Sequence, residues 1–127
     1  VSVSPQIPFI NDDMEQVLEA ARDAGASSAF YVVLRLPWEL SPLFRQWLDI
    51  HYPDRAARVM ARMHDLRGGK DYDAHFATRM RGQGIWADLL HQRFVKTCDR
   101  LGYQRSREPL DVSRFRPAAL RGQGDLF

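Results

Sequence analysis

The stretch Phe30-Tyr31-Val32-Val33-Leu34-Arg35-Leu36-Pro37 decides how this chain folds. It is an apolar run whose one charge, on Arg35, comes two residues before a proline. A run this short and continuous, rich in β-branched and aromatic residues, predicts a strand buried on both faces rather than a helix. Pro37 is expected to end the strand, because proline has no N–H group to donate to a sheet.

The residues before this strand predict the rest of a parallel βαβ unit. A shorter strand is predicted over residues 1–4 and a helix over residues 12–24. Asp12 is the expected N-cap of the helix, with Glu15 at the third helical position that a capping box requires, and Gly25 is the expected terminator. The buried stripe of the helix has i, i+3, i+4 and i+7 spacing: Met14, Val17, Leu18 and Ala21.

A βαβ unit constrains what the whole molecule can be. Parallel strands occur almost only in sheets that helices cover on both faces, and usually in sheets of more than two strands. The sequence predicts no third strand downstream. We therefore expect this chain to be the C-terminal part of a larger α/β protein, and expect it to self-associate on its own through an unpaired strand edge.

The residues after the strand predict helices rather than strands. The expected helices lie over residues 41–51, from Pro53 to the pair Gly68-Gly69, and over residues 85–101. Ser41 and Pro42 read as the cap and first-turn proline of the first of these helices. The segment 70–84 has neither the helical nor the strand period, so it is predicted to be a loop, long enough to suggest a function.

These predictions divide the chain into three parts. They are a βαβ unit over residues 1–37, a helical extension over residues 38–102 that contains loop 68–84, and an arginine-rich tail over residues 103–127.

Composition narrows the class of protein. The chain has 127 residues, 45% of them hydrophobic and 11% aromatic, which is enough for one domain with an adequate core. No apolar run approaches the roughly 20 residues that a membrane helix needs, so no membrane partner is expected. The single cysteine, Cys98, excludes an internal disulfide and any multi-cysteine metal site within these residues, which favours a reducing, cytoplasmic location.

The net charge of +2 is small but unevenly distributed. From Arg100 onward there are six arginines and three acidic residues. Such a tail can bind phosphate, but no recognition motif accompanies the arginines. A solvated or self-packing tail is therefore the favoured interpretation, with nucleic-acid binding as the alternative.

Candidate ligand-binding residues lie where the predicted strands end. Ligand sites in parallel α/β folds form at the carboxyl ends of the strands, which here are residues 4–12 and 35–39. Arg35 is the most informative of these residues, because a charge near the end of a buried strand is costly unless it is paired or bound to an anion. The sequence is compatible with two roles for Arg35, a ligand contact and a structural ion pair.

A second candidate site lies in the loop before the last helix. Arg79, Arg81 and Gly82 combine cations with a backbone that a ligand can approach, just before a helix N-terminus, as an anion or substrate site requires. An ordinary turn is the alternative, because no phosphate-binding fingerprint is present. Asp71, Asp73 and His75 lack the spacing of an established metal site, so no metal is expected there.

Several of these stretches resemble the late barrel region of radical S-adenosylmethionine (radical SAM) enzymes, most closely the group related to spore photoproduct lyase. In that group a strand ends in Pro-x-Ile-Pro-x-x-Asn-Asp, which matches Pro5 to Asp12, and a Leu-Arg-Leu-Pro strand follows, which matches Leu34 to Pro37. The resemblance covers most of the chain to about Gly102. It continues through Pro53-Asp54-Arg55, Arg67-Gly68-Gly69, Tyr72 and Arg79-Met80-Arg81-Gly82.

The resemblance implies a fold and a function. The fold is a partial (βα)6 TIM-like barrel whose fifth and sixth strands are the two strands here, followed by a helical extension. The complete protein would use S-adenosylmethionine and a [4Fe–4S] cluster to form a 5′-deoxyadenosyl radical, which abstracts hydrogen from an unknown substrate. The implied cofactor-binding positions are Pro5, Ile7, Pro8, Arg35, Leu36 and Pro37.

One feature of that family is missing from these 127 residues. The Cys-x-x-x-Cys-x-x-Cys loop that holds the cluster is absent. We therefore expect the chain alone not to be catalytic, and expect its main partner to be the N-terminal barrel portion of the same protein. The alternatives are a non-enzymatic, basic nucleic-acid-binding module and a helical interaction module.

Overall fold

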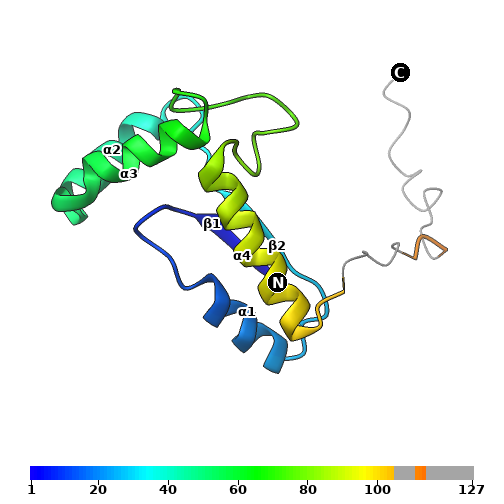
Figure 1. Ribbon diagram of the computed structural model, residues 1–127. Helices are drawn as coiled ribbons and strands as arrows, with labels where there is room; N and C mark the ends of the chain where they lie inside the picture. Colours follow the sequence, from blue (N-terminus) through cyan, green and yellow to red (C-terminus); the bar gives the residue numbers. More distant parts are fainter. Residues whose placement is uncertain (105–110, 114–127) are drawn as a thin grey trace, which may run out of the picture.

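The computed structural model describes residues 1–104 and 111–113, which form a mixed α/β fold (Figure 1). Within these residues there are four helices and one parallel sheet of two strands. The elements, in chain order, are β1 (Ser2–Gln6), α1 (Met14–Asp23), β2 (Phe30–Val33), α2 (Leu40–His51), α3 (Pro53–Leu66) and α4 (Ile85–Leu101). The predicted βαβ unit is confirmed, because β1 and β2 are parallel and α1 connects them.

The sheet is covered on one face. Val3, Tyr31 and Val33 point into a core that α1 and α4 build together, and they are 5%, 7% and 0% exposed. On the other face Ser2 is exposed and Phe30 is 45% exposed. The prediction that the second strand is buried on both faces is therefore wrong for the described residues. Only one face of the strand is buried because both helices pack on the same side of the sheet, next to each other (Figure 1).

The second strand is also shorter than the predicted 30–37. The last strand pair is Gln6 with Val33, after which the chain leaves the sheet. The outer edge of β2 is occupied at this point, because the Val33 amide donates to the Met80 carbonyl at 2.9 Å and the Val33 carbonyl accepts from Arg67 at 3.2 Å. A loop and an arginine, rather than a further strand, thus complete the hydrogen bonds of β2 at Val33.

Helix α1 begins two residues later than predicted and lacks the predicted capping box. Its N-cap is Asp13, whose side chain makes no capping hydrogen bond. Glu15 does not turn back to the cap, because its carboxylate binds Arg93 of α4. The predicted buried stripe is right for Met14 and Leu18, which are fully buried, and wrong for Val17, which is 37% exposed. Gly25 takes the left-handed φ of 94° just after the helix.

Helices α2 and α3 lie side by side at one end of the molecule and enclose a second core (Figure 1). The buried residues of that core are Leu36, Leu48, Val59, Met60 and Met63. The prediction that Ser41 caps α2 is wrong. The helix begins one residue before Ser41, at Leu40, and its N-cap is Glu39. The hydroxyl of Ser41 instead donates to Asp71 in the following loop.

The predictions for the loop 70–84 and for the last helix are confirmed. Residues 70–84 contain no helix or strand, and α4 has the predicted bounds. In the part of the chain that the structure describes, no helix is both long and apolar enough to cross a bilayer. Most of the arginine-rich tail, residues 105–110 and 114–127, lies outside the described residues, so the predictions for it stay predictions.

Candidate ligand site at the carboxyl ends of the strands

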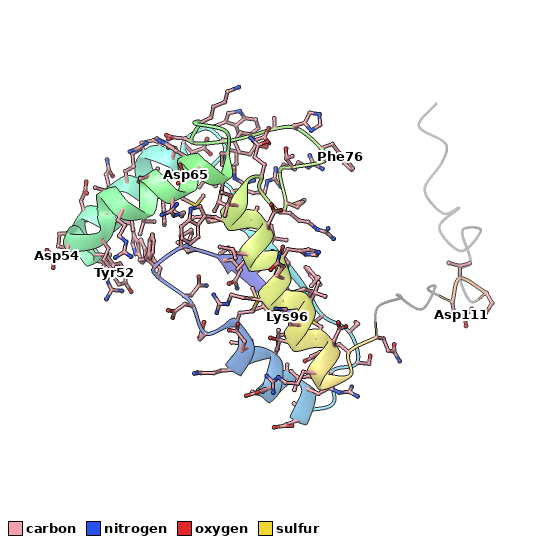
Figure 2. The ribbon with its side chains drawn as sticks, viewed as in Figure 1. Tyr52, Asp54, Asp65, Phe76, Lys96 and Asp111 are labelled. Carbon is pink, nitrogen blue, oxygen red and sulfur yellow. The ribbon has the colours of Figure 1, made fainter. Side chains whose placement is uncertain are left out.

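A pocket of about 360 Å³ lies where the two strands end. Gln6 and Val33, the last residues of β1 and β2, line it together with the loop that leaves β1. Helices α3 and α4 form its opposite wall, and most of its lining is apolar. The remaining lining residues are Ile7, Pro8, Phe9, Asn11, Asp12, Arg62, Leu66, Trp86, Leu89, Leu90 and Arg93. Figure 2 shows the side chains of these elements.

The loop after β1 is held rigidly. Asn11 clamps it, since its Oδ1 accepts from the Ile7 amide at 2.6 Å and its Nδ2 donates to the Pro5 carbonyl at 2.7 Å. Phe9 has a φ of 63°, a left-handed conformation that is uncommon for a residue other than glycine. Arg55 donates to the Phe9 carbonyl at 3.1 Å, and the Arg58 guanidinium lies 3.9 Å from the Phe9 ring centre. Such a pinned, strained loop beside a pocket is typical of a functional site.

Two arginines stand at the rim of the pocket. The guanidinium of Arg62 lies 3.7 Å from the Trp86 ring centre and also binds Asp65 at 2.7 Å, while its buried Nε has no hydrogen-bond partner among the described residues. Arg93 binds both carboxylate oxygens of Glu15, at 2.8 and 2.7 Å. This hydrogen-bonded pair lowers the pKa of Glu15 and raises the pKa of Arg93. Both rim arginines are therefore already paired with carboxylates of the chain, and Arg62 also covers the Trp86 ring.

The implied cofactor-binding residues fall in different places. Of the six, Ile7 and Pro8 line the pocket. Pro5 lies within β1, and Leu36 is 3% exposed in the core under α2 and α3. Pro37 begins the turn into α2, where its carbonyl accepts from the Leu40 amide at 3.0 Å.

Arg35 faces the loop between α3 and α4 rather than the pocket. Its Nη2 donates to the Tyr72 hydroxyl at 2.9 Å, and its guanidinium lies 5.6 Å from the centre of that ring. Its Nη1 approaches the Met80 sulfur at 3.9 Å. Among the described residues no carboxylate pairs with it, and its buried Nε has no partner. The structural ion pair that the sequence left open is thus not formed within the described chain.

Sequence reasoning missed Arg67 as a key residue. It is 2% exposed, and its guanidinium donates to four backbone carbonyls, two where β2 ends and two in loop 70–84. The acceptors are Val33 at 3.2 Å, Leu34 at 2.6 Å, Thr78 at 3.3 Å and Arg79 at 2.8 Å. Burial lowers the pKa of Arg67, and the nearby Asp73 carboxylate partly offsets that effect. In the sequence, the position of Arg67 just before Gly68-Gly69 indicated a helix end and nothing about its side-chain hydrogen bonds.

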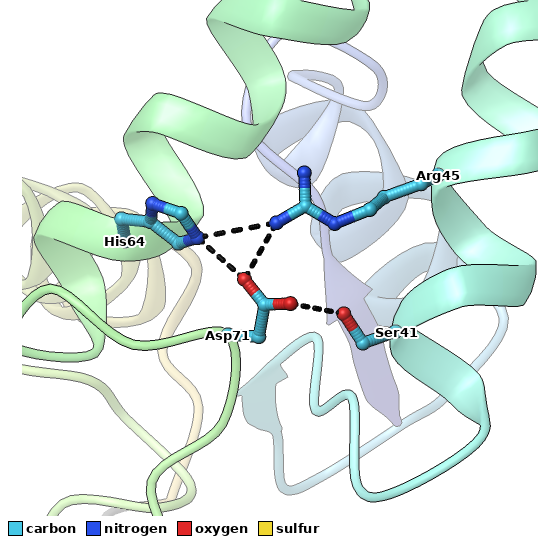
Figure 3. A network of polar contacts seen from close by, with 4 residues as sticks. All are labelled: Ser41, Arg45, His64 and Asp71. Atoms are coloured by element: carbon cyan, nitrogen blue, oxygen red, sulfur yellow. Dashed lines mark hydrogen bonds and ion pairs between the residues drawn. The ribbon is translucent and has the colours of Figure 1, made fainter.

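A second network fixes the start of the same loop (Figure 3). The Asp71 carboxylate accepts from Ser41, from His64 Nε2 at 2.5 Å and from Arg45 at 2.7 Å. Those hydrogen bonds, with the Ser41 contact the largest cause, lower the pKa of Asp71 to about 2. Ser41 and His64 bind different oxygens of the carboxylate, so the described residues show no direct serine–histidine contact here.

Two of the three residues of the predicted anion site on the loop, Arg79 and Gly82, make contacts within the fold. The Arg79 carbonyl accepts a hydrogen bond from Arg67, and the Arg79 guanidinium lies 4.5 Å from the Phe76 ring centre. Arg81 is exposed. Gly82 has a φ of 78°, and a Cβ there would meet Leu66 at 3.1 Å, so close packing explains the glycine. The described residues contain no group of three or more metal-binding side chains.

Comparisons with protein-family models, with curated proteins and with solved structures find no match.

Proposed function

We propose that this chain forms the last two strands and a helical cap of a partial (βα)6 barrel of the radical SAM kind. Its strand ends and the loop after β1 would form one wall of a site for S-adenosylmethionine and a substrate. The chemical class of that ligand comes from the resemblance. Support from the molecule comes from how the sheet is covered and from the pocket at its carboxyl end.

The one-sided sheet is the observation that carries the proposal. In a barrel, crossover helices lie outside the sheet and further strands curve over its inner face. Among the described residues α1 and α4 cover one face, while Ser2 and Ser4 on the other face are exposed. At Val33 the outer edge of β2 is closed by Met80 and Arg67, as suits a last strand, and β1 has β2 as its one neighbour in the described sheet. The edge of β1 is then where a further strand adds.

The residues of this chain do not fit an iron–sulfur cluster. Such clusters are held by several cysteine thiolates, and the sequence has Cys98 alone. Cys98 is buried beside Ala29 and Phe30 at the opposite, amino end of the strands, and burial raises the pKa of its thiol. Cluster ligands would have to come from other barrel units, so the share of this chain is binding and shielding.

The pocket and Arg35 suit different groups of the proposed ligands. The apolar wall that includes Ile7, Pro8 and Trp86 suits a flat base such as adenine. Arg35 has no carboxylate partner in the described chain, so it is available to a carboxylate of the cofactor or substrate.

The test is Arg35→Met in the complete gene product, with Arg45→Met as a matched control. Arg35 has a hydrogen bond to Tyr72 but no ion pair to lose among the described residues, so we expect the melting temperature to change little. We expect a loss of about tenfold or more in affinity for S-adenosylmethionine or substrate, measured by calorimetric titration. Arg45 pairs with Asp71, so its variant should lose stability and keep affinity. An Arg35→Met protein that is destabilised but binds both ligands normally would contradict the assignment.

A second candidate function has its own observation, an exposed aromatic ring beside cations. Phe76 is 80% exposed, with Arg79 stacked over it and Arg81 nearby in the sequence. Such rings stack on the bases of single-stranded nucleic acid, and the cations meet its phosphates. This function predicts oligonucleotide binding that falls steeply between 50 and about 200 mM salt and weakens in Phe76→Ala. Binding that is independent of salt would exclude it.

A further inference from the structure

Two arginines, one after β2 and one in loop 70–84, have guanidinium groups that no carboxylate of the described chain binds. They are Arg35 and Arg79, and both are half-buried. The buried Nε of each has no hydrogen-bond partner among the described residues. Arg35 donates to the Tyr72 hydroxyl at 2.9 Å, and the Arg79 guanidinium lies 4.5 Å from the Phe76 ring centre. Both guanidinium groups therefore keep N–H donors for a ligand.

Backbone hydrogen bonds bring these two arginines to the same place. The Arg67 guanidinium donates to the Leu34 carbonyl at 2.6 Å and to the Arg79 carbonyl at 2.8 Å. The Arg35 Nη1 also lies 3.9 Å from the sulfur of Met80, the residue that follows Arg79. The chain at Arg35 thus runs beside the chain at Arg79, although the two segments are far apart in the sequence.

The positive charge at this place exceeds the negative charge that the described residues supply there. Burial lowers the pKa of Arg67, the positive charge of Arg35 lowers it further, and the Asp73 carboxylate raises it. Both oxygens of Asp73 already accept hydrogen bonds, from the His75 amide at 2.9 Å and from the Thr78 hydroxyl. Three guanidinium groups near one carboxylate are costly to hold together unless an anion is bound.

The loop that carries Arg79 is held in place at three points. Asp71 fixes its start, Arg67 fixes its middle, and the Gln83 amide donates to the Leu66 carbonyl at 3.0 Å near its end. A connection of this length in a compact domain is usually a functional one. A guanidinium that the fold already holds in position loses little freedom when it binds a ligand, which favours affinity.

We propose that Arg35 and Arg79 together bind the phosphate group of a phosphate-monoester substrate. The planar fork of an arginine matches two phosphate oxygens at once. A terminal phosphate carries about two negative charges, whereas a phosphate of a nucleic-acid backbone carries one. Two guanidinium groups at one place therefore suit the monoester better. This inference rests on the proposed function, because it names the chemical class of the substrate that Arg35 would meet.

The test is a titration of the complete gene product with methyl phosphate, followed by phosphorus NMR at constant ionic strength and without S-adenosylmethionine. We expect saturable binding that is about tenfold or more tighter than that of dimethyl phosphate, which carries one charge. Arg35→Gln and Arg79→Gln should each weaken methyl phosphate binding about tenfold or more. The melting temperature of each variant checks that it is folded, and Arg79→Gln decides if Arg35→Gln is not.

Arg58→Gln is the matched control. The Arg58 guanidinium also lies against an aromatic ring, that of Phe9 at 3.9 Å, and it has no ion pair among the described residues. It stands on α3, away from Arg35 and Arg79 in the sequence, so its loss should leave methyl phosphate binding unchanged.

Several results would overturn the proposal. They are the absence of saturable methyl phosphate binding, and binding that both folded variants leave unchanged. Equal affinity for methyl and dimethyl phosphate would assign the two arginines to the backbone phosphates of nucleic acid instead. Failure of the proposed function is seen separately, as a lack of 5′-deoxyadenosine release. Release of 5′-deoxyadenosine by a protein that does not bind methyl phosphate would contradict the phosphate alone.

Discussion

A single buried guanidinium, that of Arg67, ties the end of β2 to the loop between α3 and α4. Its four carbonyl partners belong to segments more than ten residues away in sequence. Charged hydrogen bonds of this kind contribute about 1.5–3 kcal/mol each in favourable cases, and a buried group left unpaired costs about 1–3 kcal/mol. Arg67 therefore fixes the geometry of the loop on which Arg79 and Arg81 stand.

Replacing Arg67 tests this role. In Arg67→Met all four carbonyls lose this donor, and that of Thr78 alone keeps another described one, the Gly82 amide. We therefore expect a loss of about 3 kcal/mol or more in the free energy of unfolding, measured by urea denaturation. The control is Arg100→Met, because Arg100 pairs with Glu19 at the surface and its loss should cost less than about 1 kcal/mol. Equal losses in the two variants would show that the Arg67 hydrogen bonds are unimportant.

Asp71 should make the stability of the fold depend on pH in the acidic range. The pKa of Asp71 is lowered from 3.8 to about 2, so its carboxylate stabilises the fold above about pH 4, and this contribution disappears as the pH falls towards 2. Its side chain is 34% exposed, so the contribution is on the order of 1 kcal/mol.

The matching experiment compares urea denaturation of wild-type protein and Asp71→Asn between pH 7 and pH 2. We expect a stability gap above pH 4 that closes towards pH 2. Asp49→Asn, outside the network, provides the control for general charge effects. A gap that stays constant across the range would mean that Asp71 does not titrate as described.

Single residues of this kind were the least predictable from sequence. Spacing identified Met14 and Leu18 as buried, because one helix face is a local property. Arg67 and Asp71 depend on partners brought close by tertiary packing, which a linear pattern does not contain. The same reason misplaced Glu15 in a capping box, since Arg93 lies 78 residues away in the chain.

At the level of elements, helix ends marked by glycine were the most predictable. The bounds of α4 follow from Gly84 and Gly102, both of which have positive φ. The second strand was predicted four residues too long, because its length is set by its pairing with β1 and by Arg67 rather than by its own composition.

The turn before α4 should be sensitive to a single methyl group. Gly82→Ala places a Cβ 3.1 Å from the side chain and the carbonyl of Leu66, in addition to the cost of a positive φ. Gly69→Ala has a φ of 82° but nothing within 4 Å of the new Cβ, so it measures the backbone cost alone, about 1–2 kcal/mol. We expect Gly82→Ala to lower the free energy of unfolding by more than Gly69→Ala. A loss no larger than that of Gly69→Ala would indicate that Leu66 moves aside freely.

For the whole molecule, the parallel βαβ unit and the run of helices after it were predictable, whereas the way the sheet is covered was not. A continuous apolar run such as 30–34 indicates burial without saying which neighbour buries each face. In the described residues α1 and α4 share one face and leave the other open. That open face is the basis for proposing further barrel strands, and with them a cofactor site at the carboxyl end.

The most direct test of that proposal is the chemistry of the complete gene product. Purified without oxygen, reduced with dithionite and supplied with S-adenosylmethionine, it should contain iron and sulfide and release 5′-deoxyadenosine, measured by liquid chromatography. The proposal predicts 5′-deoxyadenosine at many times the level of a protein-free control. A complete, folded gene product with neither bound iron nor 5′-deoxyadenosine release would contradict it.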